Sequence, residues 1–301
     1  MIVQLRLFAA AIAILALQLT NCRADIYVFG DSLSETGNFY VATGGQLPPS
    51  PLYFHGRFSN DKNWVEHVAK AVREPVPLPS LLGGTNFAFN GARAKGLSPY
   101  LAPDLTEQVA SYLLRSGGAA NPDDIFVIWA GANDIFFGAS SGEADFIPNA
   151  IAGIKWSIEA LYSAGARKFV ILDLPPLGQT PFFNTSPALS TQLDGATSAF
   201  NSAIASLTRS LRAELPQAKV ADVKISKLFQ LITRAPRLFG LRNVRQAATL
   251  FDPVTGIGYT TTSGANPKYY LFWDSVHPTG QGHKIIAAYV LIDYKLHCAR
   301  R

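Results

Sequence analysis

The sequence predicts an α/β protein with a parallel sheet covered by helices on both faces. Short apolar runs of strand length, such as Ile125–Trp129 and Lys168–Leu172, alternate with segments of helical periodicity. The first run is apolar throughout, as expected for a central parallel strand. Strands that alternate with helices imply right-handed βαβ units. No repeat or linker is evident in the 301 residues, so one domain is expected over residues 25–301.

Five strands are expected, and the sheet should be mostly parallel. Residues 26–29 form an apolar, β-rich run that ends at Gly30. Phe87 and Phe89 alternate with smaller residues, which predicts a short strand within 85–92 that ends at Gly91. The other expected strands are 125–129, 168–172 and 219–223.

Helical periodicity recurs between the expected strands. A helix should begin near Asp61 with Asn60 or Ser59 as its cap, because an apolar stripe with helical spacing follows. A Gly- and Pro-rich loop over 41–60 precedes it; such a loop either borders a cleft or is a plain surface connection. Further helices are expected over about 104–114, 146–163, 187–215 and 279–296, short helices over 226–248, and a loop over 252–268.

Composition excludes some classes of function. Hydrophobic residues make up 48% of the chain and charged residues 16%, which fits a folded globular core. The net charge is +5, and no block of Lys and Arg is present, so nucleic-acid binding is not expected. Neither Cys22 nor Cys298 has metal-ligand spacing, so no metal site is predicted. Glycine-rich nucleotide fingerprints are absent as well, and no cofactor is expected.

Residues 1–24 resemble a secretory signal, and a secreted or periplasmic protein is expected. Arg6 is followed by an apolar run over 7–17, and small residues precede an expected cut after Ala24. Cleavage would remove two of the 26 basic residues and none of the 21 acidic ones, which leaves +3. A membrane anchor is the alternative, but the run is about half the ~20 residues that a span needs. Lipidation at Cys22 is a second alternative, although Asn21 is unfavourable before that cysteine.

Ser32 lies directly after the first expected strand, in the stretch Gly-Asp-Ser-Leu-Ser. In open α/β sheets, ligands bind in the crevice outside the carboxyl ends of the strands. An ordinary turn rich in Gly, Asp and Ser is the alternative interpretation.

Asp274 and His277 stand three residues apart, just before the last expected helix. A serine hydroxyl needs a base to take its proton, and the base needs a third group to hold its tautomer. Ser32, His277 and Asp274 could fill these roles. A histidine that merely caps the helix or lies at the surface is the alternative.

Acyl transfer also needs donors for the developing oxyanion. Gly91 can offer a backbone N–H without a Cβ to block close approach. Asn133 can offer a side-chain N–H at the end of the 125–129 strand. A tight turn at Gly91 and an Asx-turn between Asn133 and Asp134 are the alternatives.

Four blocks together resemble the SGNH hydrolases, also called GDSL esterases and lipases. They contain Ser32, Gly91, Asn133 and the Asp274–His277 pair, in the order of that family. The resemblance implies Ser32 as nucleophile, His277 as base and then acid, and Asp274 as its orienting group. It implies an oxyanion hole from the Ser32 and Gly91 N–H groups and the Asn133 side chain, and a flavodoxin-like, three-layer α/β/α fold. Asn90 departs from the pattern, because Gly or another small residue is common there.

Three functions follow from this sequence. A secreted serine ester hydrolase acting on small-molecule or lipid esters is the first. A phospholipase or lipid acyltransferase is the second, with Phe136 and Phe137 meeting a lipid. A catalytically silent binding protein of the same fold is the third, and the intact set of site residues disfavours it. A flavodoxin-like nucleotide-binding protein is a fourth hypothesis, because the fold alone does not decide function. The absence of a glycine-rich nucleotide-binding motif from the sequence disfavours it. The natural substrate, the acyl-chain preference and the oligomeric state stay open.

Overall fold

The computed structural model describes residues 24–250 and 265–299. Its main sheet has four parallel strands in the order β1-β2-β3-β4, and Val28 lies opposite Val127 in the register of the first pair. Each strand up to β3 pairs in parallel with the next strand in sequence, which requires a crossover connection between them. The predicted α/β fold with a parallel sheet is confirmed. The strands are β1 (Ile26–Gly30), β2 (Ile125–Trp129), β3 (Lys168–Leu172) and β4 (Lys219–Val223).

The segment expected as a fifth strand, 85–92, runs beside β1 without forming a strand. Phe87 N–H donates to Val28 O at 2.7 Å, and Val28 N–H donates to Thr85 O at 3.1 Å. The pairing stays an isolated bridge, because the side chain of Asn86 accepts the N–H of Ala88 and turns the chain. The segment lies on the outer side of β1. If it is counted as the second of five extended segments in chain order, the spatial order is 2-1-3-4-5, as in flavodoxin-like folds.

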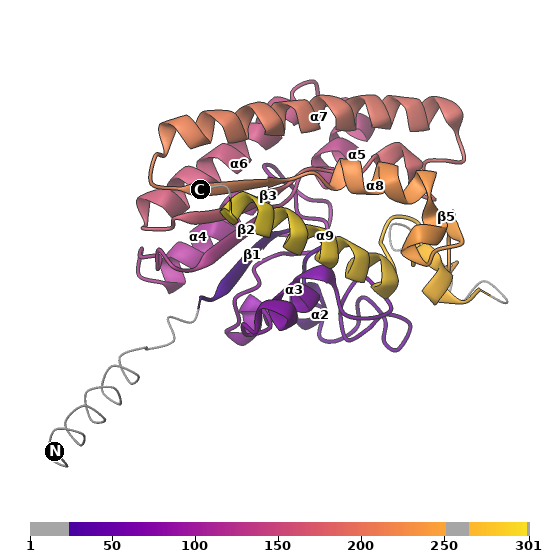
Figure 1. Ribbon diagram of the computed structural model, residues 1–301, viewed down its shortest axis with the longest axis horizontal. Helices are drawn as coiled ribbons and strands as arrows, with labels where there is room; N and C mark the ends of the chain where they lie inside the picture. The colour runs from indigo at the N-terminus through magenta and orange to yellow at the C-terminus, as the bar shows by residue number, and fades with distance from the viewer. Residues whose placement is uncertain (1–23, 251–264, 300–301) are drawn as a thin grey trace, which may run out of the picture.

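Helices cover both faces of the sheet (Figure 1). The long helices α6 (Phe146–Ser163) and α7 (Pro187–Glu214) lie on one face, where α4 (Leu105–Arg115) packs against α6. On the other face, α3 (Trp64–Val72) packs against α9 (Gly280–Ala299). The fold therefore has the predicted three α/β/α layers.

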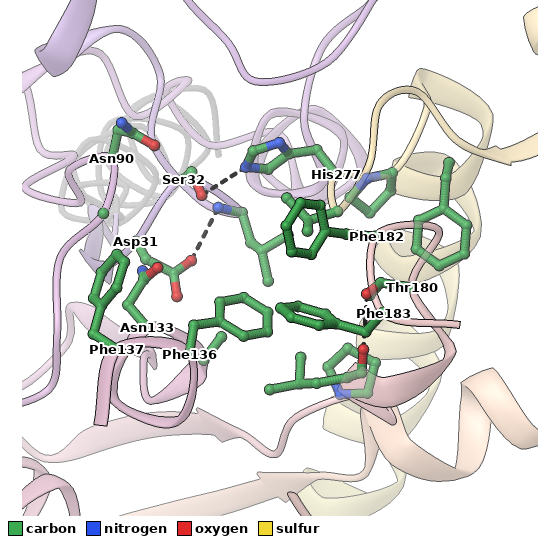
Figure 2. A pocket seen from close by; sticks show the side chains of 18 of the residues that line it. Asp31, Ser32, Asn90, Asn133, Phe136, Phe137, Thr180, Phe182, Phe183 and His277 are labelled. Atoms are coloured by element: carbon green, nitrogen blue, oxygen red, sulfur yellow. Dashed lines mark hydrogen bonds between the residues drawn. The ribbon is translucent and has the colours of Figure 1, made fainter. Parts of the chain in front are cut away.

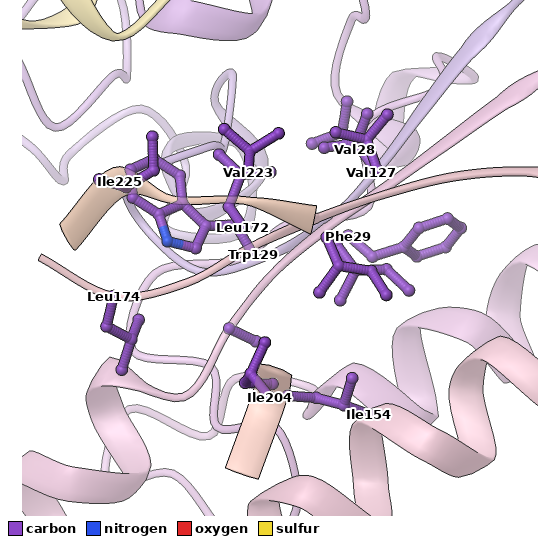
Figure 3. Close-up of a cluster of buried hydrophobic side chains, with 14 of the residues drawn as sticks. Val28, Phe29, Val127, Trp129, Ile154, Leu172, Leu174, Ile204, Val223 and Ile225 are labelled. Carbon is purple, nitrogen blue, oxygen red and sulfur yellow. The ribbon is translucent and has the colours of Figure 1, made fainter. Parts of the chain in front are cut away.

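Alternating strand residues fill the two halves of the core. Val28 and Phe29 on β1 point to opposite faces of the sheet, and both are fully buried (Figure 3). Phe29 lies on the same side as Ile154 of α6 and Ile204 of α7 (Figure 3). The burial on both faces explains why these strands read as continuous apolar runs.

The expected helices form, with one shifted start. Helix α3 begins at Trp64 rather than near Asp61, and its cap is Asn63 rather than Asn60 or Ser59. Asn63 and Glu66 exchange side-chain and backbone hydrogen bonds in a capping box, which requires an acidic residue three positions after the cap. The remaining helices match their expected ranges within three residues.

Several elements were not predicted. Where short helices were expected over 226–248, α8 (Ile225–Arg234) is followed by a strand, β5 (Asn243–Ala247), which pairs in parallel with β6 (Tyr270–Phe272). A polar, partly exposed strand that pairs with a distant segment leaves no apolar period in the sequence. Two further helices, α2 (Asn38–Ala42) and α5 (Ala132–Ser141), and four 3₁₀ helices (Ser80–Leu82, Leu177–Gln179, Pro236–Phe239 and Pro267–Tyr269) complete the described chain.

The expected signal segment, up to residue 23, and most of the expected 252–268 loop lie outside the described residues. Within residues 24–250 and 265–299, no helix combines the length and apolar character that a membrane crossing needs.

Candidate active site

Ser32 follows the carboxyl end of β1, at the point where the sheet order reverses. The chain leaves β1 for the 85–89 segment on one side, and β2 lies on the other side. Such a switch point is where open α/β sheets form a crevice. The backbone of Gly30 can lie close to the backbone of Trp129 on β2 only without a side chain, because a Cβ at Gly30 would lie 2.0 Å from the carbonyl oxygen of Trp129. The carbonyl of Asp31 then accepts the N–H groups of Ser34 and Glu35, which closes the turn that presents Ser32.

The predicted nucleophile, base and orienting residue form one hydrogen-bonded chain. Ser32 Oγ lies 2.9 Å from His277 Nε2 (Figure 2), and His277 Nδ1 lies 2.8 Å from Asp274 Oδ2. Ser32 and His277 are 245 residues apart in sequence. Ser32 and the 5% exposed His277 line the pocket, whereas Asp274 is fully buried behind them.

The Asp274–His277 turn is held by its own backbone. Asp274 Oδ1 accepts the N–H groups of Val276 at 2.9 Å and His277 at 2.7 Å, and Trp273 N–H donates to His277 O at 2.7 Å. The turn therefore presents carboxylate and imidazole together, as the Asp-x-x-His spacing predicts. A further donor comes from outside the turn, since the Tyr53 hydroxyl donates to Asp274 Oδ2 at 2.7 Å.

Gly91 and Asn133 line the same pocket as Ser32. Asn133 Nδ2 donates to Ala92 O at 2.9 Å, which fixes the amide and leaves its second N–H for another acceptor. The alternative of an Asx-turn at Asn133 is not observed, because Asn133 lies inside α5 and the N–H of Ile135, which such a turn would use, donates to Gly131 O at 3.2 Å. Gly91 has φ of +71°, and a Cβ there would lie 2.3 Å from the Tyr100 ring, so glycine is required.

The pocket beside Ser32 has a volume of about 260 Å³ and walls that are mainly apolar. The rings of Phe136 and Phe183 stack against each other in one wall of the pocket, with centroids 5.0 Å apart (Figure 2). Phe182 extends the same wall, and its backbone N–H donates to Ser275 O at 3.0 Å, inside the turn that carries His277. The shape and chemistry fit an apolar group attached to a carbonyl at Ser32.

Two carboxyl groups are buried behind the Ser32 turn. Burial raises the pKa of Asp31 to about 7 and that of Glu35 to about 8. Backbone donors offset part of this, since Leu33 N–H donates to Asp31 and Asn90 N–H to Glu35. One oxygen of each carboxyl has no hydrogen-bond partner in the described part of the chain. Both groups therefore retain a proton far more readily than exposed carboxyls do.

Replacing Glu35 by glutamine is expected to change how stability depends on pH. The pKa of Glu35 is higher in the folded state than in the unfolded state. Its contribution to the free energy of unfolding is therefore complete below about pH 4.5 and is lost as the pH rises through about 8. The cost reaches at most about 1.4 kcal/mol per pH unit. Melting temperatures from pH 5 to 9 should fall less steeply in Glu35→Gln than in wild type. Glu143→Gln is the control, because a hydrogen bond from Arg93 lowers the pKa of Glu143, and in this variant the melting temperature should fall at alkaline pH as in wild type. A slope in Glu35→Gln equal to that of wild type would contradict the prediction.

The family model of GDSL-like lipases and acylhydrolases matches residues 26–290 of this sequence. The chain belongs to this GDSL family. Relatives of this chain include the thermolabile hemolysin of Vibrio parahaemolyticus. It is 27% identical over 282 residues, which cover 88% of this chain and 62% of the hemolysin. The chain thus spans less than two thirds of that relative.

Two further relatives of this chain differ in what their names state. The phosphatidylcholine-sterol acyltransferase of Aeromonas hydrophila is 25% identical over 300 residues, covering 87% of each chain. The inactive GDSL esterase/lipase-like protein 23 of Arabidopsis thaliana is 26% identical over 298 residues, covering 86% of this chain and 77% of the relative. Membership in the GDSL family alone therefore does not decide activity, and the site must carry that argument.

Proposed function

We propose that the chain is a secreted serine ester hydrolase that works through an acyl-enzyme intermediate. The observation that carries the proposal is the hydrogen-bonded chain from Ser32 through His277 to Asp274, which opens onto the pocket lined by Gly91 and Asn133. Secretion rests on residues 1–24 alone, and an N-terminus at Asp25 on exported protein would be its check.

The geometry suggests the order of proton transfers. His277 Nε2 takes the proton of Ser32 as Oγ attacks the ester carbonyl, while Asp274 holds Nδ1–H toward itself. The oxyanion is stabilised by the N–H groups of Ser32 and Gly91 and by the second amide N–H of Asn133. His277 then returns the proton to the leaving alcohol. Water, deprotonated by the same imidazole, releases the acid and restores the Ser32 hydroxyl.

The apolar pocket supports esters with an acyl chain longer than acetyl. Each methylene that enters it should gain about 0.8 kcal/mol, or roughly fourfold in kcat/KM, until the ring of Phe183 stops the chain. A series of p-nitrophenyl esters of increasing length should therefore rise and then level off. In Phe183→Ala the plateau should move to longer esters while acetate turnover changes little. A flat series in wild type would sink the acyl-pocket assignment.

Two alternatives stay testable in the same assays. A phospholipase or lipid acyltransferase is favoured by the apolar pocket and by the name of the Aeromonas relative; phosphatidylcholine hydrolysis, with and without an added alcohol acceptor, would distinguish it. A catalytically silent binding protein has a precedent in the inactive Arabidopsis relative. Turnover of p-nitrophenyl acetate by purified protein would exclude this last reading.

A further inference from the structure

Tyr53 contacts the site from a part of the chain that the hydrolytic scheme above does not use. Its hydroxyl donates to Asp274 Oδ2 at 2.7 Å, across 221 residues of sequence, and both side chains are fully buried. Tyr53 belongs to the Gly- and Pro-rich loop that precedes α3, which the sequence left open as either a cleft border or a surface connection.

The donors around Asp274 divide into two groups. The N–H groups of Val276 and His277, and Nδ1 of His277, all belong to the same short turn as the carboxylate. They move together with the carboxylate if the turn shifts. Tyr53 ties the carboxylate to a different element, and it does so on Oδ2, the oxygen closer to Nδ1. The phenol therefore adds an anchor for Oδ2 that comes from outside the turn.

Aromatic packing fixes the phenol. The Tyr53 ring lies with its centroid 6.0 Å from that of Phe58 and 6.3 Å from that of Trp273. Phe58 in turn lies against the imidazole of His277, with centroids 5.0 Å apart. One loop segment thus contacts the carboxylate through Tyr53 and the imidazole through Phe58.

We propose that Tyr53 is a positioning residue for the Asp274–His277 pair. Its O–H holds the carboxylate in the orientation that receives Nδ1–H, and it withdraws part of the negative charge that the imidazole senses. The inference rests on the proposed esterase function, since it concerns the base of that reaction. A hydrogen bond to an ionised group is stronger than one between neutral groups, so its loss should be measurable in turnover.

The sign of the effect on pH dependence follows from charge. Without the phenol, Asp274 would carry its charge less dispersed, which favours protonated His277. The acid limb of the kcat/KM profile should then move to higher pH. In the described part of the chain, two further titratable groups that interact with the imidazole are Asp31, which can ionise in the same range, and His283, which burial keeps neutral by lowering its pKa to about 3. Because both are present in every variant, the difference between variants isolates Tyr53.

The experiment compares Tyr53→Phe with wild type and with Tyr112→Phe. Tyr112 is equally buried, but its hydroxyl lies 3.5 Å from the carbonyl of Ala119, away from the site. Hydrolysis of a soluble short-chain p-nitrophenyl ester is measured from pH 5 to 9, with the melting temperature of each protein. Tyr53→Phe should lose about 10- to 100-fold in kcat at its pH plateau with little change in KM, and its acid limb should move upward. Tyr112→Phe should keep both the rate and the limb.

A second variant covers the case in which Tyr53→Phe does not fold. Site-specific replacement of Tyr53 by a fluorinated tyrosine keeps the hydroxyl and makes it a stronger donor, so the acid limb should move to lower pH. A Tyr53→Phe protein with wild-type rate and limb overturns the inference, and so does a fluorinated protein whose limb does not move. Wild-type turnover that Ser32→Ala abolishes is established first. If that turnover is absent, the proposed function fails and the inference with it; if it is present, a negative result at Tyr53 overturns the positioning role alone.

Discussion

Replacing Ser32 by alanine is expected to abolish ester hydrolysis, with a loss in kcat of about 10⁶-fold. The hydroxyl that His277 faces at 2.9 Å would be gone, and no acyl-enzyme could form. Residual turnover by water would depend on the oxyanion donors alone. Steady-state kinetics on a soluble p-nitrophenyl ester would measure the loss. The melting temperature should stay near that of wild type, because a half-buried hydroxyl at the pocket contributes little to the core.

A serine-directed phosphonate should label Ser32 and no other residue. Ser34 offers a matched control on the same turn, since it is fully buried and its Oγ accepts the indole N–H of Trp64 at 3.2 Å. Ser34→Ala should therefore lower stability while keeping the label and the activity. Recovery of the label on Ser34 or Ser275 in a peptide digest would show that a different hydroxyl is the nucleophile.

Replacing Asn133 by alanine is expected to cost about 10²- to 10³-fold in kcat, or roughly 3–4 kcal/mol of transition-state stabilisation. One amide N–H is already bound to Ala92 O, and the second is the one that the oxyanion would receive. KM should change little, because the ground-state carbonyl gains less from this contact. Asn133→Asp should be worse, since it places a carboxylate beside the developing negative charge.

A structural asparagine gives the control for Asn133. Asn201 bonds both the N–H and the carbonyl of Leu174 with its side chain and lies outside the pocket. Asn201→Ala should lower the melting temperature with kcat nearly unchanged, which is the pattern of a purely structural amide. If Asn133→Ala shows that same pattern, with kcat within about threefold of wild type, the oxyanion role is contradicted and a structural role through the hydrogen bond to Ala92 O remains.

The sequence predicted the fold well where the signal is local. Strands β1, β2 and β3 appear in the sequence as short, largely apolar runs, because each is buried on both faces of the sheet. The start of α4 was predicted within one residue, and Glu107 stands three residues after its cap. The same capping box marks α3, whose start was predicted about three residues too early. The failures are at segments such as Asn243–Ala247, whose strand character depends on a partner more than twenty residues away.

The same division applies to the site. The predicted site residues lie at strand ends or at a helix start, where sequence patterns indicate them, and the fold brings them to one pocket. They are Ser32, Gly91, Asn133 and the Asp274–His277 turn. Their catalytic roles stay predictions. Tyr53 carried no such mark, because its role depends on a contact made across 221 residues. The sequence indicated Phe136 and Phe137 as residues that would meet a lipid, but it did not indicate Phe182 and Phe183, because a phenylalanine between elements is equally typical of the core.

The backbone bond from Phe182 to Ser275 links substrate fit to reaction speed. The wall that contacts the acyl chain and the turn that carries His277 are joined by this hydrogen bond, so a shift of either backbone segment strains or breaks it. This hydrogen bond is expected to limit laboratory evolution toward bulkier esters, because a backbone shift at Phe182 that widens the pocket would strain the turn that carries His277. Breadth of substrate and rate of turnover are therefore expected to trade against each other at residues 182–183, while side-chain changes at Phe136, on the separate helix α5, can alter breadth on their own.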